Sequence, residues 1–266
     1  MNLDALKQKF LNNLIEKCGA YSQRILVAFS GGPDSTALLH LLIRTREKWK
    51  GELVVVHVNH SLRQNASDDE AFCRQFCEGY NIPFITRKVN VLRHSKLQKL
   101  SIEMAARELR YKALFEVFEK EKCDAVALGH HRDDQVETVL GNIVRGTGLR
   151  GLTGMHFQKE NKIRPLLDFQ QVEILEYLGA ENISYRVDES NFETAYKRNK
   201  LRHNLLPLLQ QKYNPQIADA LIKLSRLSHD AEEYIVTQAK EALDIIIIEK
   251  THTKIVLDID SLRHYF

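Results

Sequence analysis

Short strand-like runs alternate with longer helix-like segments along the first half of the chain. The runs are rich in apolar and β-branched residues and occupy residues 25–29, 53–58, 84–89 and 125–128. The longer segments carry apolar residues at helical spacing and occupy residues 3–18, 36–42, 67–80, 101–120 and 135–144. A strand that is apolar along its length is covered on both faces, so this alternation predicts a parallel sheet between two layers of helices. We therefore expect an α/β, Rossmann-like fold.

Helical patterns dominate the rest of the chain. The expected elements are a basic helix, a second helix and two strand-like runs, at residues 193–211, 216–242, 245–248 and 253–258. Tyr213-Asn214-Pro215 separates the two helices, and an Asn-Pro pair interrupts regular structure. We therefore predict a catalytic domain over residues 1–212. Residues 213–266 are expected to form a small, mostly helical segment, a linker followed by the start of a C-terminal domain.

The composition is that of an ordinary globular protein, with 44% hydrophobic and 27% charged residues. The formal net charge is only +3, so a surface for nucleic acid would have to come from a local cluster of basic residues. The four cysteines are scattered and include no C-x-x-C pair; they are Cys18, Cys73, Cys77 and Cys123. With no apolar leader or membrane-length apolar run, we expect a reduced, cytoplasmic location.

The segment from Ser30 to Ser35, Ser-Gly-Gly-Pro-Asp-Ser, joins the first predicted strand to the helix that follows. Such a turn leaves backbone N–H groups unpaired at a helix N-terminus, where the helix dipole also favours an anion. Gly31 and Gly32 let the backbone fold tightly around a phosphate group, and Pro33 suits the first helical turn. The segment therefore predicts a phosphate-binding loop.

The same segment differs from the commonest phosphate-binding loops. It lacks the Gly-Lys-Ser/Thr end of a Walker loop and the G-x-G-x-x-G of a dinucleotide site. Asp34 is unexpected beside an anion, because like charges repel. Either Asp34 caps the helix or it holds a cation that bridges to the phosphates. An ordinary strand-to-helix turn is the alternative to a phosphate site.

Polar residues also follow two other predicted strands. His57, Asn59, His60 and Arg63 stand at the end of the second, and a dense polar block from Gly129 to Thr138 follows the fourth. Ligands of parallel sheets bind at the carboxyl ends of the strands, so these segments are expected to share one cleft with the phosphate loop. A structural role inside the strand for His57, and a polar loop with a satisfied histidine at His60, are the alternatives.

Asp134 and Glu137 lie three residues apart at the start of a predicted helix, so they share one face. Two carboxylates on one face can bind a metal ion or an ammonium group. His130 and His131 permit a zinc site, but adjacent histidines cannot easily ligate one ion and no cysteine accompanies them. A site for Mg²⁺ or an amine is therefore favoured, with a helix start that merely complements the dipole as the alternative.

Three further segments have two interpretations each. Arg107 stands four residues after Glu103, so it either forms a helix salt bridge or reaches a triphosphate. The glycine-rich segment 145–155 is either a lid or a plain loop. The basic segment 196–204 either contacts RNA phosphates or forms a solvated charged face.

Together these segments resemble the N-type ATP pyrophosphatases that carry a PP-loop, and more narrowly the bacterial tRNA(Ile)-lysidine synthases. The segments that carry the resemblance are Ser30–Ser35, His57–Arg63, Glu103–Arg107 with Arg110-Tyr111, Gly129–Thr138, Arg145–Gly148, Arg164–Leu167, Asp188–Asn191 and Arg198–Arg202. The PP-loop alone indicates only the superfamily, whereas the acidic block and the Arg-Asn-x-x-Arg are more specific. The resemblance implies an adenine-nucleotide α-hydrolase-like fold.

The resemblance also implies the reaction of a C–N ligase. ATP adenylates the C2 oxygen of the wobble cytidine in a tRNA(Ile) with a CAU anticodon, releasing pyrophosphate, and the ε-amine of free L-lysine then displaces AMP. The implied cofactors are ATP and Mg²⁺, and the implied partners are the tRNA and lysine. No membrane partner is expected, and a homodimer is left open.

The resemblance assigns roles to individual positions of this chain. The expected ATP-binding residues are Ser30, Gly31, Gly32, Pro33, Asp34, Ser35, His57 and Asn59. The expected catalytic residues are Asp34, Arg107, Asp134 and Glu137. Asp34 is expected to hold Mg²⁺, and the carboxylates of Asp134 and Glu137 to bind the lysine amine. The expected tRNA-binding residues are Arg145, Arg198 and Arg202.

Two alternatives and one departure from the family pattern accompany this interpretation. A PP-loop tRNA thiolation enzyme with a paired-cysteine iron–sulfur site is the nearest rival, and the missing C-x-x-C argues against it. A non-catalytic RNA-binding module of the same fold is the other, and the intact PP-loop and acidic residues argue against it. Family members commonly carry C-terminal tRNA-binding domains, so we expect either a natural short form or a truncated chain.

Overall fold

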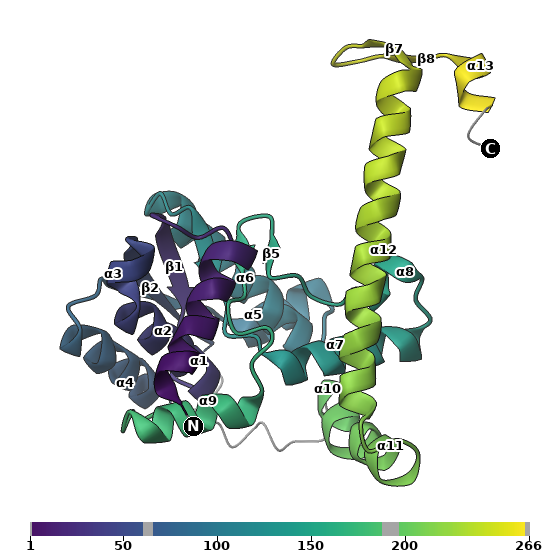
Figure 1. Ribbon diagram of the computed structural model, residues 1–266. Coiled ribbons are helices and arrows are strands. Elements are labelled where there is room, and N and C mark those ends of the chain that lie inside the picture. The colour runs from purple at the N-terminus through teal and green to yellow at the C-terminus, as the bar shows by residue number, and fades with distance from the viewer. Residues whose placement is uncertain (1, 61–65, 188–196, 264–266) are drawn as a thin grey trace.

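The computed structural model describes residues 2–60, 66–187 and 197–263, and a six-stranded sheet lies at its centre (Figure 1). The strands are β1 (Arg24–Ala28), β2 (Glu52–Asn59), β3 (Phe84–Lys88), β4 (Ala125–Ala127), β5 (Gln158–Lys159) and β6 (Lys162–Ile163). Their order is β3-β2-β1-β4-β6-β5, and only β5 pairs antiparallel, with β6. The predicted α/β fold with a mostly parallel sheet is confirmed.

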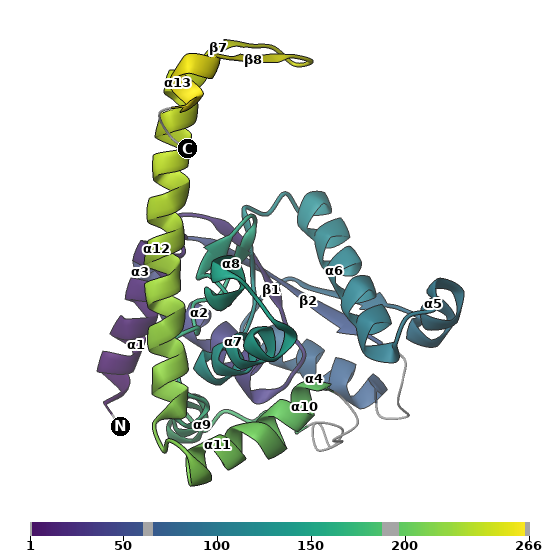
Figure 2. The same cartoon turned by 90° about the vertical axis from the view of Figure 1, so that its right-hand side faces the viewer.

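Helices cover both faces of the sheet, with α6 on one side and α2 and α4 on the other (Figure 2). The helices on the α2 side are α1 (Leu3–Asn12), a π-helical turn (Asn13–Lys17), α2 (Pro33–Arg44), α4 (Ala66–Gly79) and α9 (Gln171–Ala180). The opposite face packs against α6 (Ile102–Lys120). A short α3 (Arg46–Trp49) follows α2, and α5 (Val91–Gln98) links β3 to α6.

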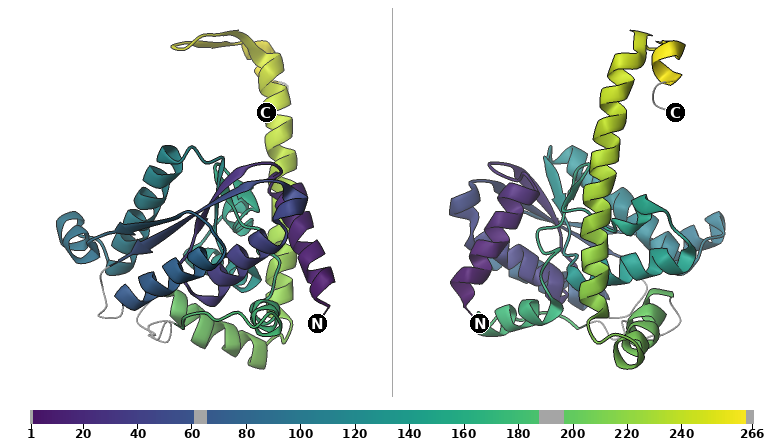
Figure 3. Two further views of the ribbon diagram at one scale, coloured as in Figure 1. Left: turned by 90° about the vertical axis from the view of Figure 1, so that its left-hand side faces the viewer. Right: turned by 45° about the vertical axis from the view of Figure 1, so that its right-hand side comes forward.

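A long C-terminal helix, α12 (Ile217–Ile246), runs past the body of the domain and projects beyond it (Figure 3). Its inner half buries Leu221, Ile222 and Ser225 against α7 (Arg132–Arg145) and α8 (Leu149–Leu152). A two-stranded hairpin, β7 (Ile247–Lys250) and β8 (Ile255–Leu257), and the short α13 (Ile259–Leu262) follow. Within the described ranges no helix combines the length and apolarity needed to cross a membrane.

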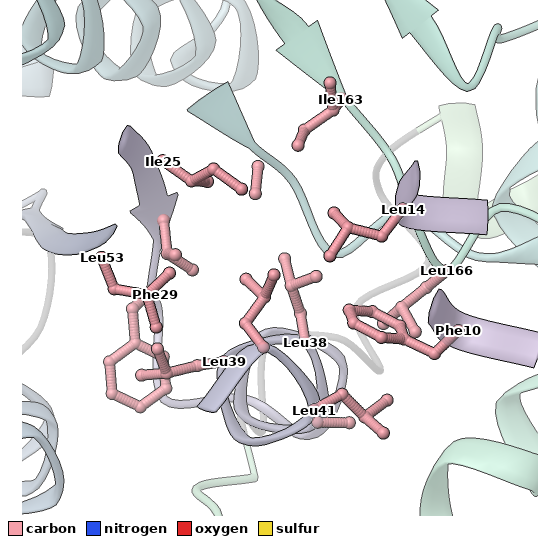
Figure 4. Packing of buried hydrophobic residues seen from close by; sticks show 14 of the residues in the cluster. Phe10, Leu14, Ile25, Phe29, Leu38, Leu39, Leu41, Leu53, Ile163 and Leu166 are labelled. Atoms are coloured by element: carbon pink, nitrogen blue, oxygen red, sulfur yellow. The ribbon is translucent and has the colours of Figure 1, made fainter. Parts of the chain in front are cut away.

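The side chains of β1 alternate between the two faces and thereby build two cores. Ile25 and Val27 join the larger core with residues of α1 and α2, such as Phe10 and Leu38 (Figure 4). Leu26, between them, points to the opposite face and packs with α6. Because the sheet is sealed on both faces, its carboxyl edge is left as the place where loops gather polar groups.

The structure contains α3, α5 and α9, which the sequence pattern does not predict, and it refines three of the predicted elements. Helix α7 begins at Arg132 rather than at Gln135, because the His131 side chain accepts the Asp133 N–H and the Asp134 side chain accepts the His131 N–H. The segment 145–155 is not wholly a loop, since it contains α8 and the buried Thr153. The basic helix is continuous from α10 (Lys197–Lys200) through a π-helical turn (Leu201–Leu205) to α11 (Leu206–Lys212), and residues 193–196 lie outside the described residues.

Candidate active site

The loop from Ser30 to Ser35 joins β1 to α2 as predicted and is held by its own serines. Ser35 Oγ donates to the Gly32 carbonyl at 3.0 Å and lies 3.0 Å from Ser30 Oγ. Gly31 has a φ of +83°, and a Cβ on it would come within 3.1 Å of Cys73 Sγ, so glycine is required here. Gly32 is the N-cap of α2 and brings no side-chain hydrogen bond. No side chain therefore caps the first amides of α2, which suits an anion.

Asp34 is the second residue of α2, after Pro33, so the capping interpretation is wrong. Its Oδ1 is buried and has no hydrogen-bond partner among the described residues. Burial raises the pKa of the Asp34 carboxyl, and the charge of His131 opposes that rise. A buried carboxylate oxygen with no hydrogen-bond partner, next to an anion-binding loop, fits the other interpretation, in which Asp34 holds a cation.

His131 connects the phosphate loop to the acidic helix start. The ring is 1% exposed, and its Nε2 lies 3.7 Å from Asp34 Oδ2 and 3.5 Å from Asp134 Oδ2. Its Nδ1 lies 3.4 Å from Asp133 Oδ2. Burial lowers the pKa of His131, but the hydrogen bond to Asp133 and the charges of Asp134 and Asp34 outweigh it, so the pKa is raised. The two segments thus meet at the carboxyl edge of the sheet, as predicted.

The carboxylates of Asp134 and Glu137 share one face, as predicted, and both contact Arg202. Arg202 Nη2 lies 3.5 Å from Asp134 Oδ1, and its Nε donates to Glu137 Oε1. The side chain of Glu137 is 3% exposed and that of Asp134 is 11% exposed. The pair therefore forms a recessed acidic site that holds a cationic nitrogen group. The sequence predicts an RNA contact for Arg202, and its contact with the acidic pair is not foreseen by any sequence pattern.

Comparison with known proteins identifies the family. Residues 3–209 match the PP-loop domain family. A tRNA(Ile)-lysidine synthase of Petrotoga mobilis is 36% identical over 222 residues, which cover 84% of this chain and 71% of that protein. The chain belongs to the tRNA(Ile)-lysidine synthase family. The enzyme of that name from Clostridioides difficile is 37% identical over 251 residues, and this chain spans 54% of its length.

Two solved structures share the fold of this lysidine synthase family member at low identity. The U34-tRNA thiolase NcsA of Methanococcus maripaludis has a TM-score of 0.69 at 20% identity, and the match covers 85% of this chain and 78% of that one. The NH3-dependent NAD synthetase of Campylobacter jejuni has a TM-score of 0.51 at 16% identity and is matched over 86% of this chain and 96% of its own. These likenesses establish a common fold and no more.

The remaining predicted ATP-site residues lie at the carboxyl end of β2 and on α6. His57 is 5% exposed, and its Nδ1 lies 2.9 Å from the carbonyl of Phe29, next to the phosphate loop. Asn59 Nδ2 donates to Glu70 Oε2 at 3.3 Å. Arg107 is exposed and stacks on Tyr111, with 5.2 Å between its guanidinium carbon and the ring centroid. The predicted ATP contacts of these residues stay predictions.

Only some of the other residues that the sequence predicts to contact RNA lie within the described part of the chain. Arg145 is exposed at the end of α7 and donates to Asn142. The side chain of Arg198 and the whole of Arg63 and Asp188–Asn191 lie outside the described residues. The RNA contacts of Arg145, Arg198 and Arg202 therefore stay predictions.

Three residues of this region escaped sequence reasoning. The sequence pattern suggests only a zinc-ligand role for His131, although its place between a strand and an acidic helix start is the signal for the observed role. Gln135 is 6% exposed and donates to the Thr153 carbonyl at 3.1 Å. Arg164 is 8% exposed and donates to the His156 carbonyl at 2.9 Å, and burial lowers its pKa. Sequence spacing cannot reveal the last two roles, because they depend on tertiary contacts.

The part of the chain that the structure describes contains no group of three or more His, Cys, Asp or Glu arranged to hold a metal ion alone. A lone carboxylate such as that of Asp34 fits a different arrangement, in which Mg²⁺ takes one protein oxygen and completes its shell with phosphate oxygens and water. The unpaired, buried Oδ1 of Asp34 beside the phosphate loop is consistent with that arrangement.

Proposed function

We propose that this protein forms lysidine on the wobble cytidine of a tRNA(Ile) with a CAU anticodon, using ATP and free L-lysine. One observation carries the proposal: a recessed acidic pair that already holds a cationic side chain is linked through His131 to the PP-loop aspartate. An ATP-driven ligation of an amine needs these two sites in one cleft. The names of the relatives support the same reaction.

The first step activates the cytidine. The C2 oxygen is a poor leaving group until it becomes a phosphate ester, so it attacks the α-phosphate of ATP and pyrophosphate departs. The uncapped amides at the start of α2 stabilise the charge that grows on the leaving pyrophosphate. When bound, Mg²⁺ would neutralise phosphate charge, and Asp34 is the residue that would hold it.

The second step forms the new bond. The ε-amine of lysine attacks C2, the C2–O bond breaks and AMP leaves. Carboxylates near an ammonium group raise its pKa, yet the nucleophile must be neutral. We therefore assign Glu137 or Asp134 as the acceptor of the proton that the amine loses during attack.

Arg202 must leave the acidic pair before lysine can bind there. Its guanidinium occupies the position that the proposal gives to the lysine ammonium group. The side chain of Arg202 is 34% exposed, so it can swing away without opening the core. A released Arg202 then becomes available to an RNA phosphate, the role predicted for it from the sequence.

Sulfur transfer is disfavoured by the state of the cysteines. All four are buried, and burial raises the pKa of each thiol, to about 12 for Cys18 and Cys77. A thiol that stays protonated and covered is neither a good nucleophile nor a good metal ligand. We also propose, following the sequence, a catalytic domain over residues 1–212, a helical linker and the start of a C-terminal tRNA-binding domain over 213–266, and action in the cytoplasm.

The test separates the two half-reactions in the Glu137→Gln variant. Transfer of labelled AMP to tRNA(Ile) should persist, because the PP-loop is intact, while incorporation of labelled lysine should fall by about 100-fold or more. Glu119→Gln, an exposed carboxylate on α6, is the matched control and should leave both steps unchanged. Equal loss of both half-reactions in Glu137→Gln would contradict the assignment.

A further inference from the structure

The segment that links β3 to α6 concentrates positive charge. Residues 87–102 contain five Arg or Lys residues and no Asp or Glu. They are Arg87, Lys88, Arg93, Lys96 and Lys99. The whole chain has a formal charge of only +3, so this short segment carries more positive charge than the protein has in excess. A local cluster of this kind indicates a polyanionic partner.

Helix α5 and the residue after it place three of these charges, those of Arg93, Lys96 and Lys99, at the protein surface. Val91 is buried, while Leu92, Arg93, Lys96 and Leu97 are exposed on the other side of the helix. These four residues, with Lys99 just after the helix, form what we call the α5 face. Leu92 is 51% exposed and Leu97 is 67% exposed, so no described part of this chain covers the face.

The α5 face rests on a defined base. His94 Nε2 lies 3.0 Å from Glu108 Oε2 on α6, which ties the two helices together. Ser95 Oγ donates to the Leu100 carbonyl at 2.7 Å and closes the turn after α5. The helix is capped by Lys99, whose φ of +54° turns the chain towards α6. The face is thus held in one orientation without using its own charges.

Within the part of the chain that the structure describes, no carboxylate neutralises the charges of the α5 face. Arg93, Lys96 and Lys99 form no ion pair with any described carboxylate, whereas other surface cations are paired, as Lys7 is with Glu181 and Lys17 with Asp168. Uncompensated cations repel one another, and a bound polyanion relieves that repulsion while releasing its own counterions.

The α5 face also stands at the functional edge of the sheet. β3 ends at Lys88 and leads into α5, just as β1 ends at Ala28 and leads into the PP-loop. Because β1, β2 and β3 are parallel neighbours, both segments leave the sheet at its carboxyl edge, about 10 Å apart. Helix α5 lies on the side of the domain away from α12 (Figure 2).

We propose that the α5 face binds the phosphate backbone of the substrate RNA next to the nucleotide that enters the PP-loop cleft. The inference rests on the proposed function, because it assumes an RNA substrate. Three uncompensated cations along one helix face match a row of phosphates, and the two leucines between them offer apolar surface to sugar edges. The α5 face is thus a second RNA contact, separate from the predicted contacts of Arg145, Arg198 and Arg202.

The experiment compares two triple variants in equilibrium binding of tRNA(Ile), without ATP or lysine. The test variant is Arg93→Gln, Lys96→Gln, Lys99→Gln, and the control is Arg44→Gln, Lys48→Gln, Lys50→Gln. Both sets are exposed, and each includes one lysine with positive φ, 54° at Lys99 and 56° at Lys50. The test variant should bind about tenfold or more weakly at about 0.1 M salt, with a salt slope lower by about two. The control should bind like the wild type.

The outcomes separate this inference from the proposed function. Weaker tRNA binding by the test variant alone supports the α5 face as an RNA contact. If the wild-type protein forms no lysidine, the proposed reaction is refuted, but the inference about the α5 face still stands on the binding result. Equal tRNA binding by the two variants overturns the inference. So does a loss of binding to anionic vesicles with tRNA binding unchanged, because it would assign the face to a membrane surface. Thermal unfolding of both variants should match the wild type, since all six side chains are exposed.

Discussion

His40 is a buried histidine that the fold keeps neutral. It is 2% exposed, and its Nδ1 lies 2.7 Å from the hydroxyl of Tyr177. Burial lowers the pKa of His40 from 6.5 to about 4, with Glu181 opposing the shift and the charges of Arg44 and Lys7 adding to it. The unfolded chain therefore binds a proton at this residue in a pH range where the folded protein does not.

The stability of the protein should depend on pH through His40. The contribution is fully present above the unfolded pKa of 6.5 and is lost as the pH falls towards 4. Between about pH 7.5 and about pH 5, the free energy of unfolding should drop by roughly 2 kcal/mol on this account. Urea unfolding of the wild type and of His40→Gln at both pH values measures the difference. The same drop in both proteins would contradict the role of His40.

Residues of the active site could be predicted to very different degrees. The PP-loop and the acidic pair have local spacings with a chemical meaning, so both were found from the sequence. The cluster of Asp34, His131 and Asp134 joins two strand ends about 100 positions apart. The expected parallel sheet predicts that these segments meet, whereas the contacts of the His131 ring depend on tertiary packing. The contact of Arg202 with Glu137 likewise depends on how the basic helix packs, which no local pattern encodes.

Helix α7 is the element that connects the site to the C-terminal helix. One side of α7 carries the acidic pair, and another carries Gln135. Gln135 Nε2 donates to the Thr153 and Met155 carbonyls, each at 3.1 Å, and contacts Ser225 Oγ on α12 at 2.9 Å. Its Oε1 accepts the Met155 N–H at 2.6 Å. A cavity of about 440 Å³ between α12 and the segment 153–158 adjoins this network and does not touch the PP-loop.

Replacing Gln135 with Leu should loosen α12 from α7. The change removes the Gln135 partner of the part-buried Met155 N–H and carbonyl, while the Thr153 carbonyl keeps its bond from Ser225 Oγ. Each polar group that loses its partner costs about 1–3 kcal/mol, so we expect a loss of about 3 kcal/mol in the free energy of unfolding. Gln8→Leu, at an exposed position of α1, is the matched control and should change it by less than about 0.5 kcal/mol. Urea denaturation measures both. A change as small as that of the control would show that solvent replaces the lost hydrogen bonds.

The predicted elements succeeded where periodicity was strong and failed where it was weak. The spacing of apolar residues predicts the buried strands and the long helices. Helix α5 was missed because Val91 is its only buried residue, so it has no apolar stripe. The start of α7 was placed three residues late because a histidine side chain acts there as the cap, outside the usual set of Ser, Thr, Asp and Asn.

The two halves of α12 should differ in local stability, because only one of them packs against the rest of the molecule. The inner half packs on α7 and α8, while Ile235, Val236 and Leu243 in the outer half are 54%, 43% and 44% exposed. Helical hydrogen bonds without tertiary packing open easily. Backbone amides in the outer half should therefore exchange with solvent roughly 100-fold faster than those of the inner half, as hydrogen-exchange mass spectrometry can measure. Uniform protection along α12 would show that its outer half is packed against another surface.

The four buried thiols have a practical consequence for following this molecule in motion. Thiol-specific probes react with thiolates that solvent can reach, and the native cysteines are neither exposed nor easily ionised. A cysteine introduced at Leu97 on the α5 face, or at Ile248 in the hairpin, would be the preferred target of a fluorescent or spin label, since both positions are more than 60% exposed. The native cysteines should therefore not react with the label and need not be replaced. Two distant points of the fold can be labelled while every cysteine that packs in the core is kept.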